Sequence, residues 1–223
     1  IFNNTPVLQD TCFIAESGNF QLEMTVGQAI KANYYFYPKW NQALAEHLVK
    51  NFGLSSKTKV KNLSNGMLSA LGIIVGIASN AKITVFDEPY IGLDVAARSL
   101  FYDLLLEQQE MNPRLFIFST HFFDEISNLL DEVLIIQDGT LKLQVDCMEW
   151  DETIVAIRGF EQELAEVAAQ HTVLYEHTFL KEKTVVLHLN EDFHVPETMK
   201  VERVSIHDVL VYLSKQRREG LTV

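Results

Sequence analysis

Two adjacent carboxylates follow a run of apolar residues near the middle of the chain. Asp87 and Glu88 come directly after Ile83–Phe86, a run that is typical of a buried strand. In open sheets of alternating strands and helices, ligands bind at the carboxyl ends of the strands. One carboxylate there can hold Mg²⁺, and a second can orient or deprotonate a water molecule. The pair also fits a strand end followed by a solvated turn, because Pro89 comes next.

Small polar residues precede one of the most apolar stretches of the sequence. Leu63-Ser64-Asn65-Gly66 leads into Met67–Ser79, which is apolar on almost every side and is predicted to be a buried helix. The open N–H groups and the positive dipole at a helix start favour an anion such as phosphate. The same residues can also serve only as an N-cap on a core helix, and the physical pattern alone favours that simpler interpretation.

A titratable side chain follows a third apolar run. Leu115–Phe118 is predicted to be a buried strand, and Ser119-Thr120-His121 stands at its carboxyl end. Histidine changes its charge near neutral pH and can therefore take part in proton transfer. A lone histidine at a strand end is more often structural than catalytic, so His121 alone does not indicate a site.

The elements that must position these groups alternate between strands and helices. This alternation runs from residue 82 to residue 136 and includes a helix from Val95 to about Glu110. It predicts an α/β fold with a mostly parallel sheet. Thr11–Ala15 is predicted to be a further strand.

Two helices are predicted between that first strand and the polar group at Ser64. Thr25 and Gln28 have the spacing of a capping box, and the helix they open is predicted to run from Val26 to Tyr37. A second helix is predicted over Trp40–Phe52 and ends at Gly53.

The pattern changes near residue 146, where we predict a domain boundary. Asp138-Gly139 is a hairpin signal just before it, between the strands Val133–Ile136 and Leu141–Val145. Residues 147–223 are predicted to form a small α+β domain of roughly ferredoxin-like type. Its predicted strands are Ile154–Ile157, Val173–Tyr175, Thr184–Leu189 and Val201–Val204, and its helices are Glu161–Gln170 and a final one from Ser205 to about Lys215.

Composition narrows the classes of partner. The 223 residues carry a net charge of -12, which argues against nucleic acid or an anionic membrane surface as the main partner. The apolar run Ala70–Ala78 is too short to span a bilayer. Cys12 and Cys147 form no metal or redox pattern, so they are predicted to be free thiols.

The order of four motifs resembles the ATP-binding subunits of ABC transporters. Leu63-Ser64-Asn65-Gly66-Met67 is similar to the signature motif, Asp87-Glu88-Pro89 to the end of the Walker B strand, Gly92-Leu93-Asp94 to the D-loop, and Ser119-Thr120-His121 to the switch histidine. The residues that make up these motifs most resemble those of the Ytr-like branch of the ABC-2 exporter group. The resemblance implies an ABC ATPase domain over residues 1–146, with a helical subdomain at about 24–80.

This resemblance also implies roles for single residues on the hydrolytic side of the site. Asp87 would be the carboxylate that serves Mg²⁺, and Glu88 would polarise the attacking water. His121 would contact the γ-phosphate of ATP. Glu16 stands where the family usually has the Q-loop glutamine, and a carboxylate there can still bind Mg²⁺ or its water.

The remaining implied roles concern a second subunit. Ser64, Asn65 and Gly66 would bind the γ-phosphate of ATP held by the opposite subunit, and Asp94 would communicate across the dimer. Asn65 and Met67 depart from the usual Gly and Gln of the signature motif. The implied cofactors are ATP and Mg²⁺.

One motif of the family is absent from these residues. No Gly-x-x-x-x-Gly-Lys-Ser/Thr occurs in the 223 residues, so the lysine that reaches the β- and γ-phosphates is missing. We therefore expect this sequence to be the C-terminal part of a longer subunit, truncated at its N-terminus.

The expected function is the ATP-hydrolysing subunit of a bacterial exporter, and the expected cargo is antimicrobial or toxic peptides. Its expected partners are membrane subunits and a second ATP-binding subunit, identical or paralogous, and no nucleic acid. Its expected location is the cytoplasm, peripheral on the inner face of the cell membrane. Two alternatives are a truncated form that binds a partner without turnover, and a soluble ABC-type ATPase outside transport.

Overall fold

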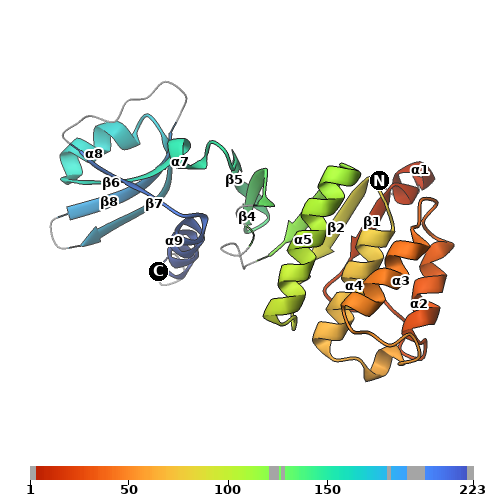
Figure 1. Ribbon diagram of the computed structural model, residues 1–223. Helices are drawn as coiled ribbons and strands as arrows, with labels where there is room; N and C mark the ends of the chain where they lie inside the picture. The colour runs from red at the N-terminus through yellow and green to blue at the C-terminus, as the bar shows by residue number, and fades with distance from the viewer. Residues whose placement is uncertain (1–3, 121–125, 127–128, 180–181, 190–198, 220–223) are drawn as a thin grey trace. The chain divides into compact units, whose positions relative to one another are not determined.

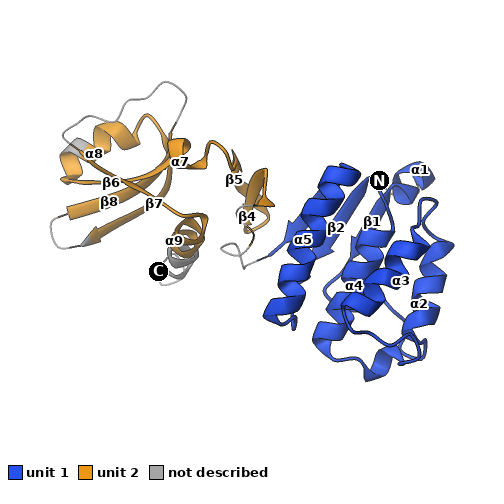
Figure 2. Ribbon diagram, in the orientation of Figure 1, with its two compact units in different colours: residues 1–121 blue, residues 122–223 orange. Residues whose placement is uncertain are grey.

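The computed structural model describes residues 4–120, 126, 129–179, 182–189 and 199–219. The chain divides into two compact units, residues 1–121 and 122–223 (Figure 2). The first unit contains α1 (Thr5–Gln9), β1 (Thr11–Ile14), α2 (Val26–Tyr34), α3 (Gln42–Asn51), a short 3₁₀ turn (Val60–Asn62), α4 (Asn65–Ala78), β2 (Ile83–Asp87), α5 (Val95–Met111) and β3 (Leu115–Ser119) (Figure 1).

The sheet of the first unit is parallel, as the alternating sequence pattern predicts. Its strands pair in the order β1-β2-β3. Asp87, the last residue of β2, lies in register with Ser119, the last residue of β3. The polar residues predicted at the ends of these two strands therefore lie side by side at the carboxyl edge of one sheet.

Helix α4 packs closely on one face of this sheet because it carries two glycines. A Cβ atom added to Gly76 would lie 2.4 Å from the ring of Phe86, and one added to Gly72 would lie 2.8 Å from Ile14 Cγ2. Phe86 also contacts Phe101 of α5, with the ring centroids 5.3 Å apart. The two helices thus hold β2, the strand that ends in Asp87.

The opposite face of the same sheet is open among the described residues. Phe13 is 59% exposed, Leu115 53% and Ile117 43%. Among the described strands, β3 pairs only with β2, so its outer edge has no strand beside it. Parallel sheets are normally covered on both faces. This face and this edge are therefore surfaces that a further element could cover.

Helix α2 begins as predicted and ends early. The Thr25 hydroxyl accepts the N–H of Gln28 at 3.2 Å, and the Gln28 side chain accepts the N–H of Thr25 at 2.8 Å, which confirms the capping box. The predicted end at Tyr37 is wrong by three residues. The carbonyl of Asn33 accepts the N–H groups of both Phe36 and Tyr37 in a turn, and the following proline disfavours a helical backbone at Tyr37.

The second unit contains the hairpin and the small C-terminal sheet. The strands and helices predicted for these residues are found, and each differs from its predicted bounds by one to four residues at one end or at both. The elements are β4 (Glu132–Gln137), β5 (Thr140–Asp146), α7 (Trp150–Thr153), β6 (Ile154–Gly159), α8 (Glu161–Ala168), β7 (Thr172–Phe179), β8 (Glu182–His188), β9 (Lys200–Arg203) and α9 (Ile206–Glu219).

The C-terminal sheet is antiparallel with the order β7-β8-β6-β9, which is the ferredoxin-like strand order. Leu164 and Val167 of α8 pack on one of its faces. The hairpin β4–β5 packs in the core of the other face, with α9. This unit therefore includes residues upstream of 146, and the domain boundary at 146 stays a prediction. Within the described residues, no helix has both the length and the apolar character needed to cross a bilayer.

Candidate functional site

Glu88 has an unusual backbone at the end of β2. Its φ angle is +47°, in the left-handed region that non-glycine residues seldom adopt. The Glu88 N–H donates to the carbonyl and to the hydroxyl oxygen of Ser119, each at 3.1 Å. The Ser119 hydroxyl in turn donates a short hydrogen bond to Asp87 Oδ1. Ser119 therefore fixes the carboxylate of Asp87 and the backbone of Glu88. Strained backbones of this kind cluster at functional sites.

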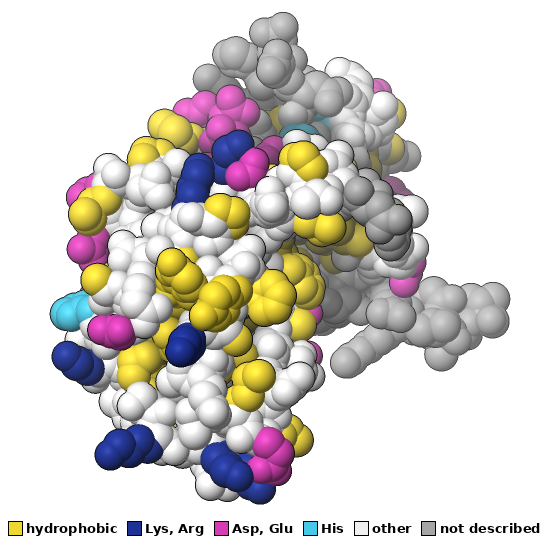
Figure 3. Space-filling model, turned by 90° about the vertical axis from the view of Figure 1, so that its right-hand side faces the viewer, with side chains coloured by type: hydrophobic (Ala, Val, Ile, Leu, Met, Phe, Trp, Pro, Cys, Tyr) yellow, Lys and Arg dark blue, Asp and Glu magenta, His cyan; other side chains and the backbone are white. Residues whose placement is uncertain are grey.

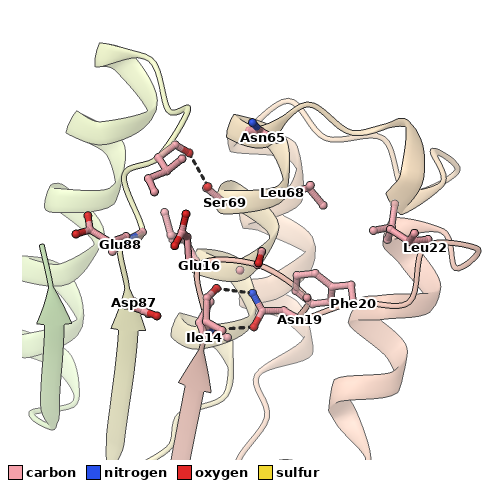
Figure 4. Close-up of a pocket in the computed structure, with 18 residues that line it drawn as sticks. Ile14, Glu16, Asn19, Phe20, Leu22, Asn65, Leu68, Ser69, Asp87 and Glu88 are labelled. Carbon is pink, nitrogen blue, oxygen red and sulfur yellow. Dashed lines mark hydrogen bonds between the residues drawn. The ribbon is translucent and has the colours of Figure 1, made fainter.

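The two carboxylates serve different sides of the strand. Figure 4 shows the Asp87 side chain pointing toward a cavity between β2 and α4, whereas the Glu88 carboxylate points to the other side, toward β3. Asp87 is thus suited to hold a cation in the cavity. Glu88 is suited to act on a molecule bound near the open edge of β3.

The cavity has a volume of about 270 Å³ and an acidic character. Glu16 and Asp87 give it this character, whereas Glu88 lines it with its carboxylate turned toward β3 (Figure 4). No lysine or arginine is among the described residues that line the cavity. Glu16 belongs to a loop that Asn19 closes. The Asn19 side chain accepts the Ala15 N–H at 2.9 Å and donates to the Ala15 carbonyl at 2.7 Å (Figure 4). The donors are hard oxygens, which suit Mg²⁺.

These carboxylates do not amount to a complete metal centre. Within the described residues, no group of three or more His, Cys, Asp or Glu side chains is placed to hold a metal ion. Mg²⁺ at nucleotide sites usually keeps several waters and binds one or two carboxylates plus substrate phosphates. The donor set therefore fits Mg²⁺ that arrives with a nucleotide.

The start of α4 has the geometry predicted from the sequence. The helix begins at Asn65, and the Ser64 hydroxyl accepts the N–H of Met67 at 3.3 Å as its N-cap. Ser64 and Asn65 are exposed, and Gly66 is half-buried. The cap role is therefore observed, and the open N–H groups of the first turn remain available for an anion.

The structure describes Asp94 but not His121. Asp94 caps α5, since its Oδ1 accepts the N–H of Ala97 at 2.8 Å. Its role across a dimer stays a prediction. His121 lies outside the described residues, so its place relative to Glu88 stays a prediction as well.

Three contacts of the site were not predicted from the sequence motifs. Ser119 holds Asp87 and Glu88, Asn19 closes the loop of Glu16, and the Ser69 hydroxyl donates to the Ile91 carbonyl at 2.7 Å. The Ser119 contact could have been predicted, because neighbouring parallel strands that end at the same edge of a sheet place their last residues side by side. The other two depend on how loops fold.

Known proteins with similar sequences are ATP-binding proteins. The ABC transporter ATP-binding protein YdbJ of Bacillus subtilis is 32% identical over 163 residues, which are 72% of this chain and 51% of that protein. ATP-binding cassette sub-family A member 7 of Rattus norvegicus is 36% identical over 98 residues, 43% of this chain and 4% of that protein. The chain thus spans about half the length of the bacterial relative.

One family model and several solved structures also match parts of the chain. Residues 52–122 match a model described as an AAA domain of the AbiEii toxin, type IV TA system. The structure of an ATP-binding subunit of an ABC transporter has a TM-score of 0.60 at 19% identity and covers 67% of this chain and 64% of its own.

A second solved structure is the ATP-binding cassette MJ0796, a dimer in a post-hydrolysis state bound to ADP and Pi. Its TM-score is 0.54 at 18% identity, over 61% of this chain and 62% of its own. At these identities the likeness concerns the fold. Sequence relatives and structural neighbours together support an ABC transporter ATP-binding domain.

Proposed function

We propose that this chain is the hydrolytic portion of an ATP-binding subunit that energises a bacterial ABC exporter. The observation that carries the proposal is Glu88, whose left-handed backbone is held by Ser119 at the carboxyl edge of a parallel sheet. From this position Glu88 would polarise the water that attacks the γ-phosphate of ATP. His121 would contact the same phosphate.

The metal and the second subunit complete the proposed site. Asp87 and Glu16 would serve Mg²⁺, which neutralises phosphate charge when it is bound. Ser64, Asn65 and Gly66 would bind ATP held by a partner subunit, since they form the capped and exposed start of α4. Asp94 would take part in the contact between the two subunits. The sequence relatives and the dimeric MJ0796 neighbour support this arrangement.

We further propose that the P-loop, the phosphate-binding Gly-x-x-x-x-Gly-Lys-Ser/Thr motif, belongs to residues of the natural protein outside this sequence. Two observations support this: β3 has an open edge among the described strands, and one face of its sheet exposes Phe13, Leu115 and Ile117. Glu88 points toward that strand (Figure 4). An intact mass of the natural protein that matched only these 223 residues would contradict this part of the proposal.

Helix α2 and the turn after it offer a surface for the membrane subunits. Tyr34, Tyr35 and Phe36 are 57%, 74% and 71% exposed. Figure 3 views the molecule from the side of α2 and α3, and it shows hydrophobic side chains gathered on this face among scattered charged ones. Exposed aromatic side chains are enriched at protein interfaces. An ATP-binding subunit held there would lie on the cytoplasmic face of the membrane. We propose that the transporter exports peptides.

A measurement of ATP binding distinguishes the proposed ATPase from a module that binds a partner without hydrolysing ATP. We expect the 223-residue chain alone to bind ATP with Kd above about 1 mM, because no lysine lines the cavity among the described residues. The natural-length protein should bind Mg-ATP at micromolar Kd and hydrolyse it. Titration calorimetry and phosphate release measure both. A natural-length protein that binds no ATP would contradict the proposed function and would favour a partner-binding module.

A further inference from the structure

The start of α4 and the loop that follows Glu88 touch through their backbones. A Cβ atom added to Gly66 would lie 2.1 Å from the Gly92 carbonyl oxygen, and one added to Gly92 would lie 2.7 Å from the Gly66 nitrogen. Gly92 also has a φ angle of +75°, which favours glycine. Only two glycines allow this approach, so the predicted phosphate-binding turn of α4 rests directly on the loop.

Ser69 fastens this contact. It lies one helical turn after Gly66, and its hydroxyl donates to the Ile91 carbonyl at 2.7 Å (Figure 4). A serine within a helix commonly donates to a carbonyl of the preceding turn instead. Here the bond joins two residues 22 positions apart, so it ties the helix to the loop and adds nothing to the helix itself.

The loop that Ser69 holds is short and internally bonded. The Ile91 N–H donates to the Glu88 carbonyl at 3.3 Å, and the Leu93 N–H donates to the Tyr90 carbonyl at 3.1 Å. Asp94 closes the loop by capping α5. Ile91 thus lies midway between Glu88 and Asp94, and fixing its carbonyl fixes the position of both ends relative to the start of α4.

We propose that Ser69 is a positioning residue that holds the loop after Glu88 in a fixed position against the start of α4. The inference rests on the proposed function. In that function Glu88 acts on ATP held by its own subunit, whereas Ser64–Gly66 acts on ATP held by the partner. A bond between the loop of Glu88 and the start of α4 therefore transmits the state of one nucleotide site to the other.

The test compares Ser69→Ala, which removes the hydroxyl, with Ser69→Thr, which keeps it. In the natural-length protein we expect Ser69→Ala to lower kcat about tenfold with little change in KM, and to lower the Hill coefficient for ATP toward 1. Ser69→Thr should restore most of kcat. Ser56→Ala is the matched control, because Ser56 is exposed and lies outside the site.

Amide hydrogen exchange supplies a readout that needs no turnover. In Ser69→Ala, the amides of Ile91 and Leu93 should exchange about tenfold faster, while those of β2 keep their protection. Unchanged exchange, or faster exchange with unchanged kcat, would overturn the inference. A wild-type protein that hydrolyses no ATP would instead overturn the proposed function, and the exchange experiment would still show whether Ser69 holds the loop.

Discussion

Replacing Glu88 with glutamine lowers ATP turnover by at least a hundredfold in the natural-length protein and leaves ATP binding intact. Glutamine keeps the size of the side chain but cannot accept a proton from the attacking water, and loss of such a group typically costs a factor of 10² to 10⁴. Steady-state phosphate release and ATP titration measure the two effects. Glu107→Gln is the matched control, since Glu107 is exposed on α5. Hydrolysis at the wild-type rate would remove Glu88 from its assigned role.

A glycine at the same position separates chemistry from backbone strain. Glu88 holds a φ angle of +47°, which costs a non-glycine residue on the order of 1 kcal/mol. Glu88→Gly should therefore be as inactive as Glu88→Gln, yet should unfold at an equal or higher temperature. A large loss of stability would show that the Glu88 side chain supports the fold and would weaken the catalytic interpretation.

Replacing Arg114 with methionine destabilises the first unit by about 3 kcal/mol. Arg114 is 9% exposed and donates to the Ile77 carbonyl at 2.8 Å, to Asn80 Oδ1 at 2.6 Å and to Gln108 Oε1 at 3.3 Å. Its guanidinium also lies 5.0 Å from the ring centroid of Phe116. Methionine fills the space but leaves buried acceptors without a donor.

The network explains why one side chain has so large an effect. Ile77 belongs to α4, Gln108 to α5, and Arg114 immediately precedes β3, so the guanidinium joins three elements of the unit. Burial lowers the pKa of Arg114 and raises the pKa of the nearby Cys12 thiol. The arginine is held in the core by its hydrogen bonds, and the thiol stays protonated and unreactive at neutral pH.

Urea unfolding followed by tryptophan fluorescence measures this loss. Trp40 reports on the first unit and Trp150 on the second, so a Trp150→Phe background isolates the first. The control is Arg203→Met in the matching Trp40→Phe background. Arg203 pairs with Asp151 while its side chain is 79% exposed, so its removal should cost under about 1 kcal/mol. A loss below about 1 kcal/mol for Arg114→Met would contradict the account of this network.

Local features of the fold were predictable because their causes are local. Thr25 and Gln28 stand three residues apart and cap α2 as expected. The hairpin turn places Asp138 and Gly139 at φ angles of +50° and +74°, as an Asp-Gly pair favours. The parallel sheet also follows from the alternation of strand and helix patterns.

The contacts that assemble the site were not predictable in the same way. Gly66 meets Gly92, Ser69 meets Ile91, and Arg114 meets Asn80 across distances along the chain that no periodic pattern encodes. The motifs indicated which residues carry chemistry, but not which side chains hold them. His121 and the dimer role of Asp94 stay predictions.

Mixing two inactive variants tests the central claim, that each hydrolytic site takes Glu88 from one subunit and Ser64–Gly66 from the other. Glu88→Gln and Ser64→Arg should each lack turnover in the natural-length protein. A head-to-tail dimer of one copy of each has one intact composite site, so an equal mixture should recover measurable phosphate release, up to about a quarter of the wild-type rate. No recovery, with mixed dimers shown to form by differential tagging, would contradict the account.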